Sequence, residues 1–103
     1  MTGLKNIILL HGALGSSVQL EKLAELLNDK FNVFLLNFSG HGKNSNPPES
    51  ISIDKLGQEL TSFIEKHKIL DPNIFGYSLG GYVGLYAATK SLVPFNSVIT
   101  LGT

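Results

Sequence analysis

The sequence predicts an α/β protein, built on a parallel four-stranded sheet with flanking helices. Three apolar runs of strand length lack the polar alternation of half-exposed strands, which is typical of parallel strands covered on both faces, and a fourth, shorter strand follows a turn signal. Segments with helical periodicity separate these runs, so strand and helix alternate along the chain. No linker, repeat or low-complexity tract interrupts the 103 residues. We therefore expect a single α/β domain over residues 1–103.

The expected strands are Asn6–Leu10, Val33–Phe38, Asn73–Tyr77 and Ser97–Leu101. The third begins directly after Asp71-Pro72, which is a clear turn signal. Short continuous apolar runs of this kind are too brief for a signal-peptide core or a membrane span. We interpret them as buried strands.

The first two expected helices are amphipathic. The first, with Ser16 or Ser17 as its cap, carries apolar residues at helical spacing, namely Leu20, Leu23, Ala24 and Leu27. The second extends from about Ser52 to Lys68, with Ser52 as its cap and Asp54 in its first turn. Its apolar stripe consists of Ile53, Leu56, Leu60, Phe63 and Ile64.

The third expected helix extends from Leu79 to about Ser91. Its residues are small and apolar nearly all round, so we expect it to be largely buried against the sheet. Gly76, Gly80 and Gly84 are spaced four residues apart, and we interpret them as positions of close packing between this helix and the sheet.

The composition excludes several functions. Lysine plus arginine balance aspartate plus glutamate, so we expect no nucleic acid partner and no attraction to an anionic membrane. Cysteine is absent, which excludes disulfides, thiolate zinc sites and a cysteine nucleophile and is compatible with a cytoplasmic protein. Charged residues make up 16% of the chain, below the usual fraction of about 25%. One explanation is that more protein normally covers part of its surface.

Glycine-rich corners follow the first three expected strands. They are His11-Gly12-Ala13-Leu14-Gly15, Gly40-His41-Gly42, and Gly76-Tyr77-Ser78-Leu79-Gly80 with Gly81 directly after it. A serine at a sharp strand-to-helix turn is typical of a nucleophile elbow, in which flanking glycines let strand and helix approach closely. With these three corners in this order, the chain resembles the α/β-hydrolase superfamily over essentially its whole length.

The resemblance implies a partial α/β-hydrolase fold with strand order 2-1-3-4. The corners at His11 and Ser78 would then meet at the carboxyl edge of the sheet, the edge where its strands end and where open α/β sheets bind ligands. The polar loop Ser39–Ser50 would flank the mouth of the active site rather than do chemistry.

The resemblance also assigns roles to residues. Ser78 would be the nucleophile, and the backbone N–H groups of Leu79 and Ala13 would form the oxyanion hole, the pair of donors that stabilises the developing negative charge. No cofactor is needed. Supporting residues would be His11, Gly12, Gly76, Tyr77 and Gly80.

The chain departs from the family in one respect. The triad order in this fold is serine, acid, histidine, and no aspartate, glutamate or histidine follows Ser78 in the 103 residues. We therefore expect the chain to be the N-terminal part of a longer α/β-hydrolase and to be inactive alone.

The three histidines all precede Ser78. In the family, the residue at His11 supports its loop, and a direct role for it in proton transfer is a minor alternative. His41 is expected to bond within its own loop, and His67 to lie at the exposed end of the second helix. No carboxylate or third histidine has ligand spacing to His11 or His41, so no metal is implied. The glycine pairs also do not match a dinucleotide or phosphate-binding motif.

The leading hypothesis is a serine hydrolase, esterase-like or lipase-like, that acts on a small-molecule acyl substrate such as an ester or thioester through an acyl-enzyme. An acyltransferase, lyase or peroxidase on the same fold is an alternative, because fold does not fix function. Another, favoured by the missing acid and base, is a non-catalytic module that binds a small acyl ligand or a partner chain. For Ser78 itself, the alternative is a serine that caps the third helix. The apolar edge strand Ser97–Leu101 also predicts a homo-oligomer or pairing with a missing C-terminal half.

Overall fold

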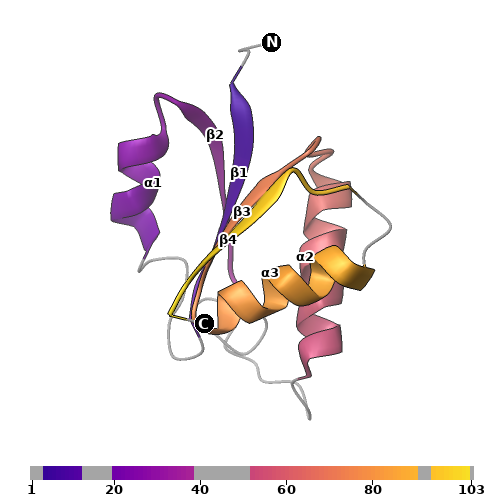
Figure 1. Ribbon diagram of the computed structural model, residues 1–103. Helices are drawn as coiled ribbons and strands as arrows, with labels where there is room; N and C mark the ends of the chain where they lie inside the picture. The colour runs from indigo at the N-terminus through magenta and orange to yellow at the C-terminus, as the bar shows by residue number, and fades with distance from the viewer. Residues whose placement is uncertain (1–3, 13–19, 39–51, 91–93, 103) are drawn as a thin grey trace.

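The computed structural model describes residues 4–12, 20–38, 52–90 and 94–102. Within these ranges the chain alternates strand and helix, as expected from the sequence (Figure 1). The elements in chain order are β1 (Lys5–Leu10), α1 (Glu21–Leu27), β2 (Phe31–Leu36), α2 (Ile53–Lys66), β3 (Asn73–Tyr77), α3 (Leu79–Lys90) and β4 (Ser97–Leu101).

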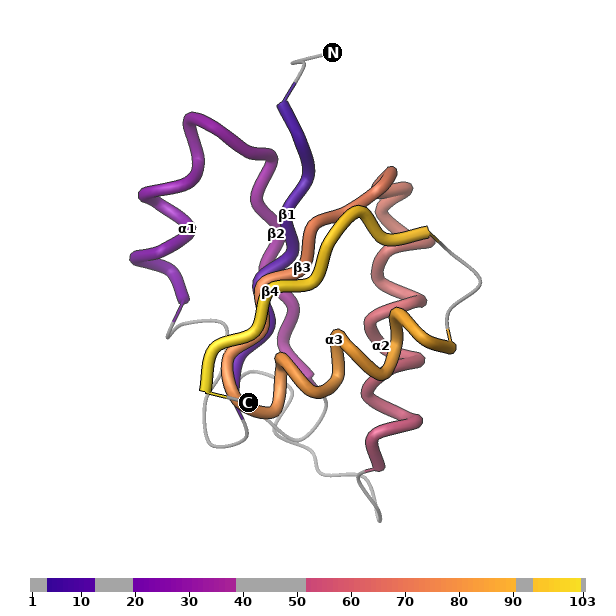
Figure 2. The backbone as a smooth tube through the Cα atoms, in the orientation of Figure 1, coloured from indigo at the N-terminus to yellow at the C-terminus, as the bar shows by residue number. Residues whose placement is uncertain are grey.

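The strands form one parallel sheet with the order β2-β1-β3-β4. This order confirms the prediction, and the strands run side by side in Figure 2. The chain moves from β1 to β2 in one direction and then adds β3 and β4 on the other side of β1. Because such crossovers are right-handed, α1 lies on one face of the sheet and α2 and α3 lie on the other (Figure 1).

The core consists of two clusters, one on each face of the sheet. Alternate residues of a strand point to opposite faces, so β1 contributes Ile8 and Leu10 to the cluster under α2 and α3, and Ile7 and Leu9 to the cluster under α1. The first cluster is the larger, and its other buried members are Leu36, Phe38, Leu56, Leu60, Ile64, Ile69, Ile74, Val83 and Ala87. The face under α2 and α3 therefore holds most of the core.

The bounds of the third and fourth strands are confirmed, whereas those of the first two differ from the prediction. β1 gains Lys5, and β2 covers Phe31–Leu36 instead of Val33–Phe38. The reason is the pairing register, which begins with Lys5 opposite Phe31 and ends with Leu10 opposite Leu36. Pairing with a neighbour, rather than the apolar run itself, sets where β2 begins and ends.

The start of α1 is not as expected. The helix begins at Glu21, and Leu20 occupies its N-cap position without a capping side-chain hydrogen bond. Ser16 and Ser17, the expected caps, lie outside the described residues, as do Ala13, His41 and the loop Ser39–Ser50.

The two ends of α2 are defined by different devices. At its start, the Ser52 hydroxyl accepts a hydrogen bond from the Lys55 N–H at 3.1 Å, which confirms the predicted cap. At its end, Lys68 adopts a left-handed backbone with φ of 52°, and the Ile69 N–H donates to the Ile64 carbonyl at 3.0 Å. This is a Schellman motif, and it ends the helix at Lys66, two residues before the predicted end.

Burial of α3 is less complete than predicted. Its glycines, Val83 and Ala87 are buried, but Tyr82 and Leu85 are 54% and 45% exposed. The small residues lie against the sheet, which leaves the larger apolar side chains on the other side of the helix, where none of the described residues buries them. In the described part of the chain, no helix combines the length and apolarity that crossing a membrane requires.

Candidate functional site

Ser78 occupies the turn that joins the last residue of β3 to the first residue of α3. Its φ is 54°, in the left-handed region that non-glycine residues rarely adopt. Its N–H donates to the Leu101 carbonyl at 2.8 Å, and its own carbonyl accepts from the Gly81 N–H at 3.1 Å. The strained residue is therefore held by β4 on one side and by the first turn of α3 on the other.

The glycines on either side of Ser78 are sites of close backbone approach. A Cβ atom on Gly76 would lie 2.3 Å from the Gly81 nitrogen, and one on Gly80 would lie 2.5 Å from the Leu10 carbonyl oxygen. A Cβ on Gly84 would lie 3.1 Å from Cγ2 of Ile74. These contacts confirm that the glycines let α3 lie close to β1 and β3, and that only glycine fits at Gly76 and Gly80.

The corner after β1 lies next to Ser78, as the strand order predicts. β1 pairs directly with β3, with Leu10 opposite Gly76. A Cβ on Gly12 would lie 3.5 Å from the Ser78 Cβ and 3.1 Å from Cδ2 of Tyr77. Residues more than sixty positions apart in the chain thus meet at the carboxyl edge of the sheet.

His11 is fully buried and engaged at both ring nitrogens. The Phe38 N–H donates to Nε2 at 3.1 Å, so Nε2 is an acceptor and the ring proton belongs on Nδ1. Nδ1 lies 2.7 Å from the Gly12 carbonyl oxygen, to which it donates. To accept a proton from Ser78, Nε2 would have to lose the Phe38 bond, so the geometry favours a supporting role for His11.

Backbone groups near Ser78 are suited to stabilise an anion. Leu79 is the first residue of the 12-residue helix α3, and the first N–H groups of a helix have no acceptor within the helix. The positive end of the helix dipole lies at the same place. A negative charge that develops beside Ser78 would therefore be stabilised.

The sequence of the chain matches a family model described as alpha/beta hydrolase fold over residues 5–103. The chain belongs to this family.

Relatives within and near this family differ in the reactions that their names describe. Ethanol acetyltransferase 1 of Hanseniaspora uvarum is 30% identical over 99 residues, which are 92% of this chain and 29% of that protein. The 3-oxoadipate enol-lactonase 2 of Acinetobacter baylyi is 27% identical, over 93% of this chain and 36% of the lactonase. A solved marine microorganism esterase has a TM-score of 0.80 and 27% identity, over 85% of this chain and 33% of the esterase. The chain, itself an α/β-hydrolase family member, thus spans about a third of the length of these relatives.

Two contacts around Ser78 and His11 in this α/β-hydrolase chain could not be predicted from the sequence. One is the Leu101 carbonyl that accepts from the Ser78 N–H, and the other is the Phe38 N–H that donates to His11. Both involve backbone groups, which every residue carries, so no residue type in the sequence marks them.

The remaining histidine that the structure describes does not lie near Ser78. His67 is exposed at the C-cap of α2, and its ring lies 4.5 Å from that of Phe63. Among the described residues, no group of three or more histidine, cysteine, aspartate or glutamate side chains could hold a metal ion.

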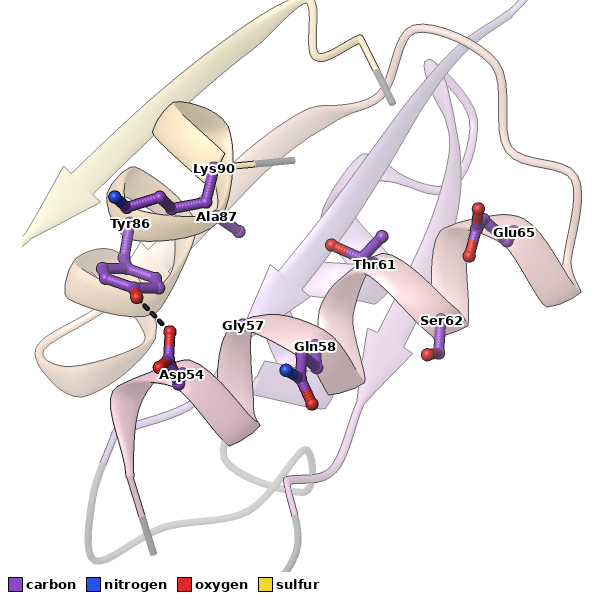
Figure 3. A pocket seen from close by; sticks show the side chains of 9 residues that line it. All are labelled: Asp54, Gly57, Gln58, Thr61, Ser62, Glu65, Tyr86, Ala87 and Lys90. Carbon is purple, nitrogen blue, oxygen red and sulfur yellow. Dashed lines mark hydrogen bonds between the residues drawn. The ribbon is translucent and has the colours of Figure 1, made fainter. Parts of the chain in front are cut away.

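A hollow of about 690 Å³ lies between α2 and α3, and Figure 3 shows its lining. Tyr86 of α3 donates a hydrogen bond across it to the Asp54 carboxylate of α2. That bond, with partial desolvation and the negative charge of Asp54, raises the pKa of Tyr86 above its ordinary value. None of the lining residues belongs to the glycine corners, so the hollow is separate from the candidate site.

Proposed function

We propose that this chain supplies the nucleophile and the oxyanion hole of a serine hydrolase that acts on an ester, thioester or similar carbonyl substrate. The observation that carries the proposal is the left-handed backbone of Ser78, with φ of 54°, at a turn that packs against Gly12. A serine that merely caps a helix normally has an extended backbone. A strained serine held at a ligand-binding edge is typical of a nucleophile elbow.

In the proposed reaction the Ser78 Oγ attacks the carbonyl carbon while a base takes its proton. The carbonyl oxygen becomes an oxyanion that accepts from the N–H groups of Leu79 and Ala13, and the bond to the leaving group then breaks, with a proton returned to that group. Water releases the acyl group by the same steps. One oxyanion donor contributes about 3 to 4 kcal/mol of transition-state stabilisation.

The base and the acid are proposed to come from polypeptide outside these 103 residues. His11 uses both ring nitrogens within its own corner, and no histidine, aspartate or glutamate follows Ser78. In this proposal the chain is the N-terminal part of a longer hydrolase. This agrees with the comparisons, in which the chain spans about a third of the length of its relatives.

The test uses the chain itself with imidazole as an external base. A fluorophosphonate that loses fluoride to Ser78 adds its phosphonyl mass, which intact-mass spectrometry detects. We expect Ser78-dependent labelling that rises with imidazole concentration and disappears in Ser78→Ala. Ser62→Ala, which removes an exposed serine of α2, is the matched control and should label like the unmodified chain. Labelling that persists in Ser78→Ala, or its absence at every imidazole concentration, would refute the proposed nucleophile.

An acyltransferase is the second candidate, and the 30% identity to an ethanol acetyltransferase favours it. The two reactions share the acyl-enzyme and differ in whether water or an alcohol releases the acyl group. In the longer protein, with p-nitrophenyl acetate and ethanol present, ethyl acetate would indicate transfer. Acetate as the sole product would indicate hydrolysis.

A self-associating or non-catalytic module is the third candidate, and the edge of the sheet favours it. Ile99 and Leu101 of β4 are 52% and 57% exposed, and the strand lacks the charged residues and proline that blunt pairing at sheet edges. We expect light scattering to show dimers or larger species of the 103-residue chain. A monomer at every concentration would contradict self-association.

The cytoplasmic location of the protein stays a prediction.

A further inference from the structure

We propose that the ring of Tyr77 is a positioning element for Ser78, because it lies between Gly12, which follows β1, and Gly102, which follows β4. This inference rests on the proposed role of Ser78. The supporting observation is that the two edges of the Tyr77 ring face different glycines. A Cβ on Gly12 would lie 3.1 Å from Cδ2 and 3.4 Å from Cε2, whereas a Cβ on Gly102 would lie 3.6 Å from Cε1. The Tyr77 ring therefore lies beside both Gly12 and Gly102.

Burial does not account for an aromatic residue at this position, since Tyr77 is 45% exposed. It is the last residue of β3, opposite Leu101 of β4 in the register. Phe75, two residues earlier, packs in the cluster under α1, so Tyr77 points to that same face of the sheet. The described part of α1 packs against β2, not over this end of β3.

The Tyr77 ring and one backbone hydrogen bond lie where the ends of β1, β3 and β4 meet. Ser78 is fixed to β4 through its N–H bond to Leu101, and Gly102 follows Leu101 with φ of 67°. The ring lies between Gly102 and Gly12. The described end of β4 lies beside the β3-to-α3 turn (Figure 2), so in this proposal the position of Ser78 relative to Gly12 depends on the ring.

Catalysis is sensitive to such distances, because a misplacement of about 1 Å can cost about 100-fold in rate. We expect Tyr77→Ala to lower the imidazole-dependent labelling rate of Ser78 by about 10-fold to 100-fold. Tyr77→Phe keeps the ring and should label like the unmodified chain. In a longer active protein, Tyr77→Ala should lower kcat more than it raises KM.

The matched control is Tyr82→Ala, which removes a tyrosine side chain that is 54% exposed on α3. It should leave labelling unchanged. Tyr77→Leu is the second variant if Tyr77→Ala does not fold, because leucine is apolar but too short to reach both glycines. Labelling of Tyr77→Ala, or of Tyr77→Leu in its place, at the unmodified rate would overturn the proposal. A loss in Tyr77→Phe equal to that in Tyr77→Ala would also overturn it.

A second readout does not depend on catalysis. The Gly12 and Gly102 amide resonances should both shift in Tyr77→Ala and stay near their original positions in Tyr82→Ala, because an aromatic ring changes the field at both glycines. If the unmodified chain does not label, the proposed nucleophile fails while the amide shifts still test the ring contact. Unchanged shifts would overturn the ring contact even where labelling succeeds.

Discussion

The two edges of the sheet are built by opposite means. At the amino edge, where the strands begin, side chains of asparagine and serine form hydrogen bonds across all four strands. At the carboxyl edge, glycines remove side chains so that backbones approach one another. The difference teaches that one edge is stabilised by side-chain hydrogen bonds, whereas the other depends on the close approach of backbones around Ser78.

Asn73 is the centre of the amino edge and is 8% exposed. Its Nδ2 donates to the Asn6 carbonyl at 3.0 Å, and its Oδ1 accepts from Asn96 Nδ2 at 2.6 Å and from the Ser97 hydroxyl at 2.7 Å. On β2, Asn32 Nδ2 donates to Asn6 Oδ1 at 3.1 Å. Because each bond requires a specific alignment, the network specifies the register of the parallel strands.

The largest effect is expected at the carboxyl edge. Gly76→Ala would place a Cβ 2.3 Å from the Gly81 nitrogen, so β3 and α3 must separate. We expect the free energy of unfolding, measured by urea denaturation, to fall by about 3 kcal/mol or more. Gly57→Ala is the control, because its nearest neighbour, at 3.3 Å, belongs to the Tyr86 side chain rather than to the backbone, and alanine favours a helix. Equal stability of the two variants would contradict the steric argument.

The next effect tests the amino edge. Asn73→Ala leaves the Asn6 carbonyl and the Asn96 and Ser97 donors without this partner. We expect a loss of about 2 kcal/mol in the free energy of unfolding. Asn28→Ala, at the exposed C-cap of α1, should change it by less than about 0.5 kcal/mol. If both variants unfold at the same urea concentration, the network does not stabilise the edge.

A smaller effect compares two left-handed residues. Lys68 ends α2 near the amino edge, and Ser78 lies at the carboxyl edge. Lys68→Gly and Ser78→Gly should each raise the free energy of unfolding by about 0.5 to 1 kcal/mol, because glycine adopts this backbone without strain. Only Ser78→Gly should abolish fluorophosphonate labelling. Lys66→Gly, within the last turn of α2, should instead destabilise the chain. A stability loss in Ser78→Gly would argue against strain at the elbow.

The smallest effect lies in the helical layer, away from both edges. The pKa of Tyr86 is raised by its hydrogen bond to Asp54, so the bond favours the protonated phenol and the folded state. Its contribution is fully present below the ordinary tyrosine pKa of about 10 and is lost as pH rises through the higher folded value. The stability difference between the unmodified chain and Tyr86→Phe should therefore be small at pH 7 and vanish in strong base. A difference that grows with pH would contradict this assignment.

Local patterns could predict most of the fold. The turn signal before β3, the apolar run of β4, the Ser52 cap of α2 and the glycine spacing from Gly76 to Gly84 each contain their own signal, and each is confirmed. The bounds of β2 could not be predicted, because they depend on pairing with β1. The exposure of one side of α3 could not be predicted either, because an apolar sequence does not show which neighbouring segments cover the helix.

The sequence by itself determined the class of fold, the order of its elements and the place of Ser78 between β3 and α3, because these follow from residue types at short spacing. Only the tertiary structure decided which groups bond to His11 and Ser78. The His11 ring bonds to the Gly12 carbonyl and the Phe38 N–H, and the Ser78 N–H donates to the Leu101 carbonyl. The tertiary structure also decided that the Tyr77 ring lies beside Gly12 and Gly102. The physical reason is that these contacts use backbone groups and glycine surfaces brought together from distant strands, and no residue type in the sequence encodes such partners.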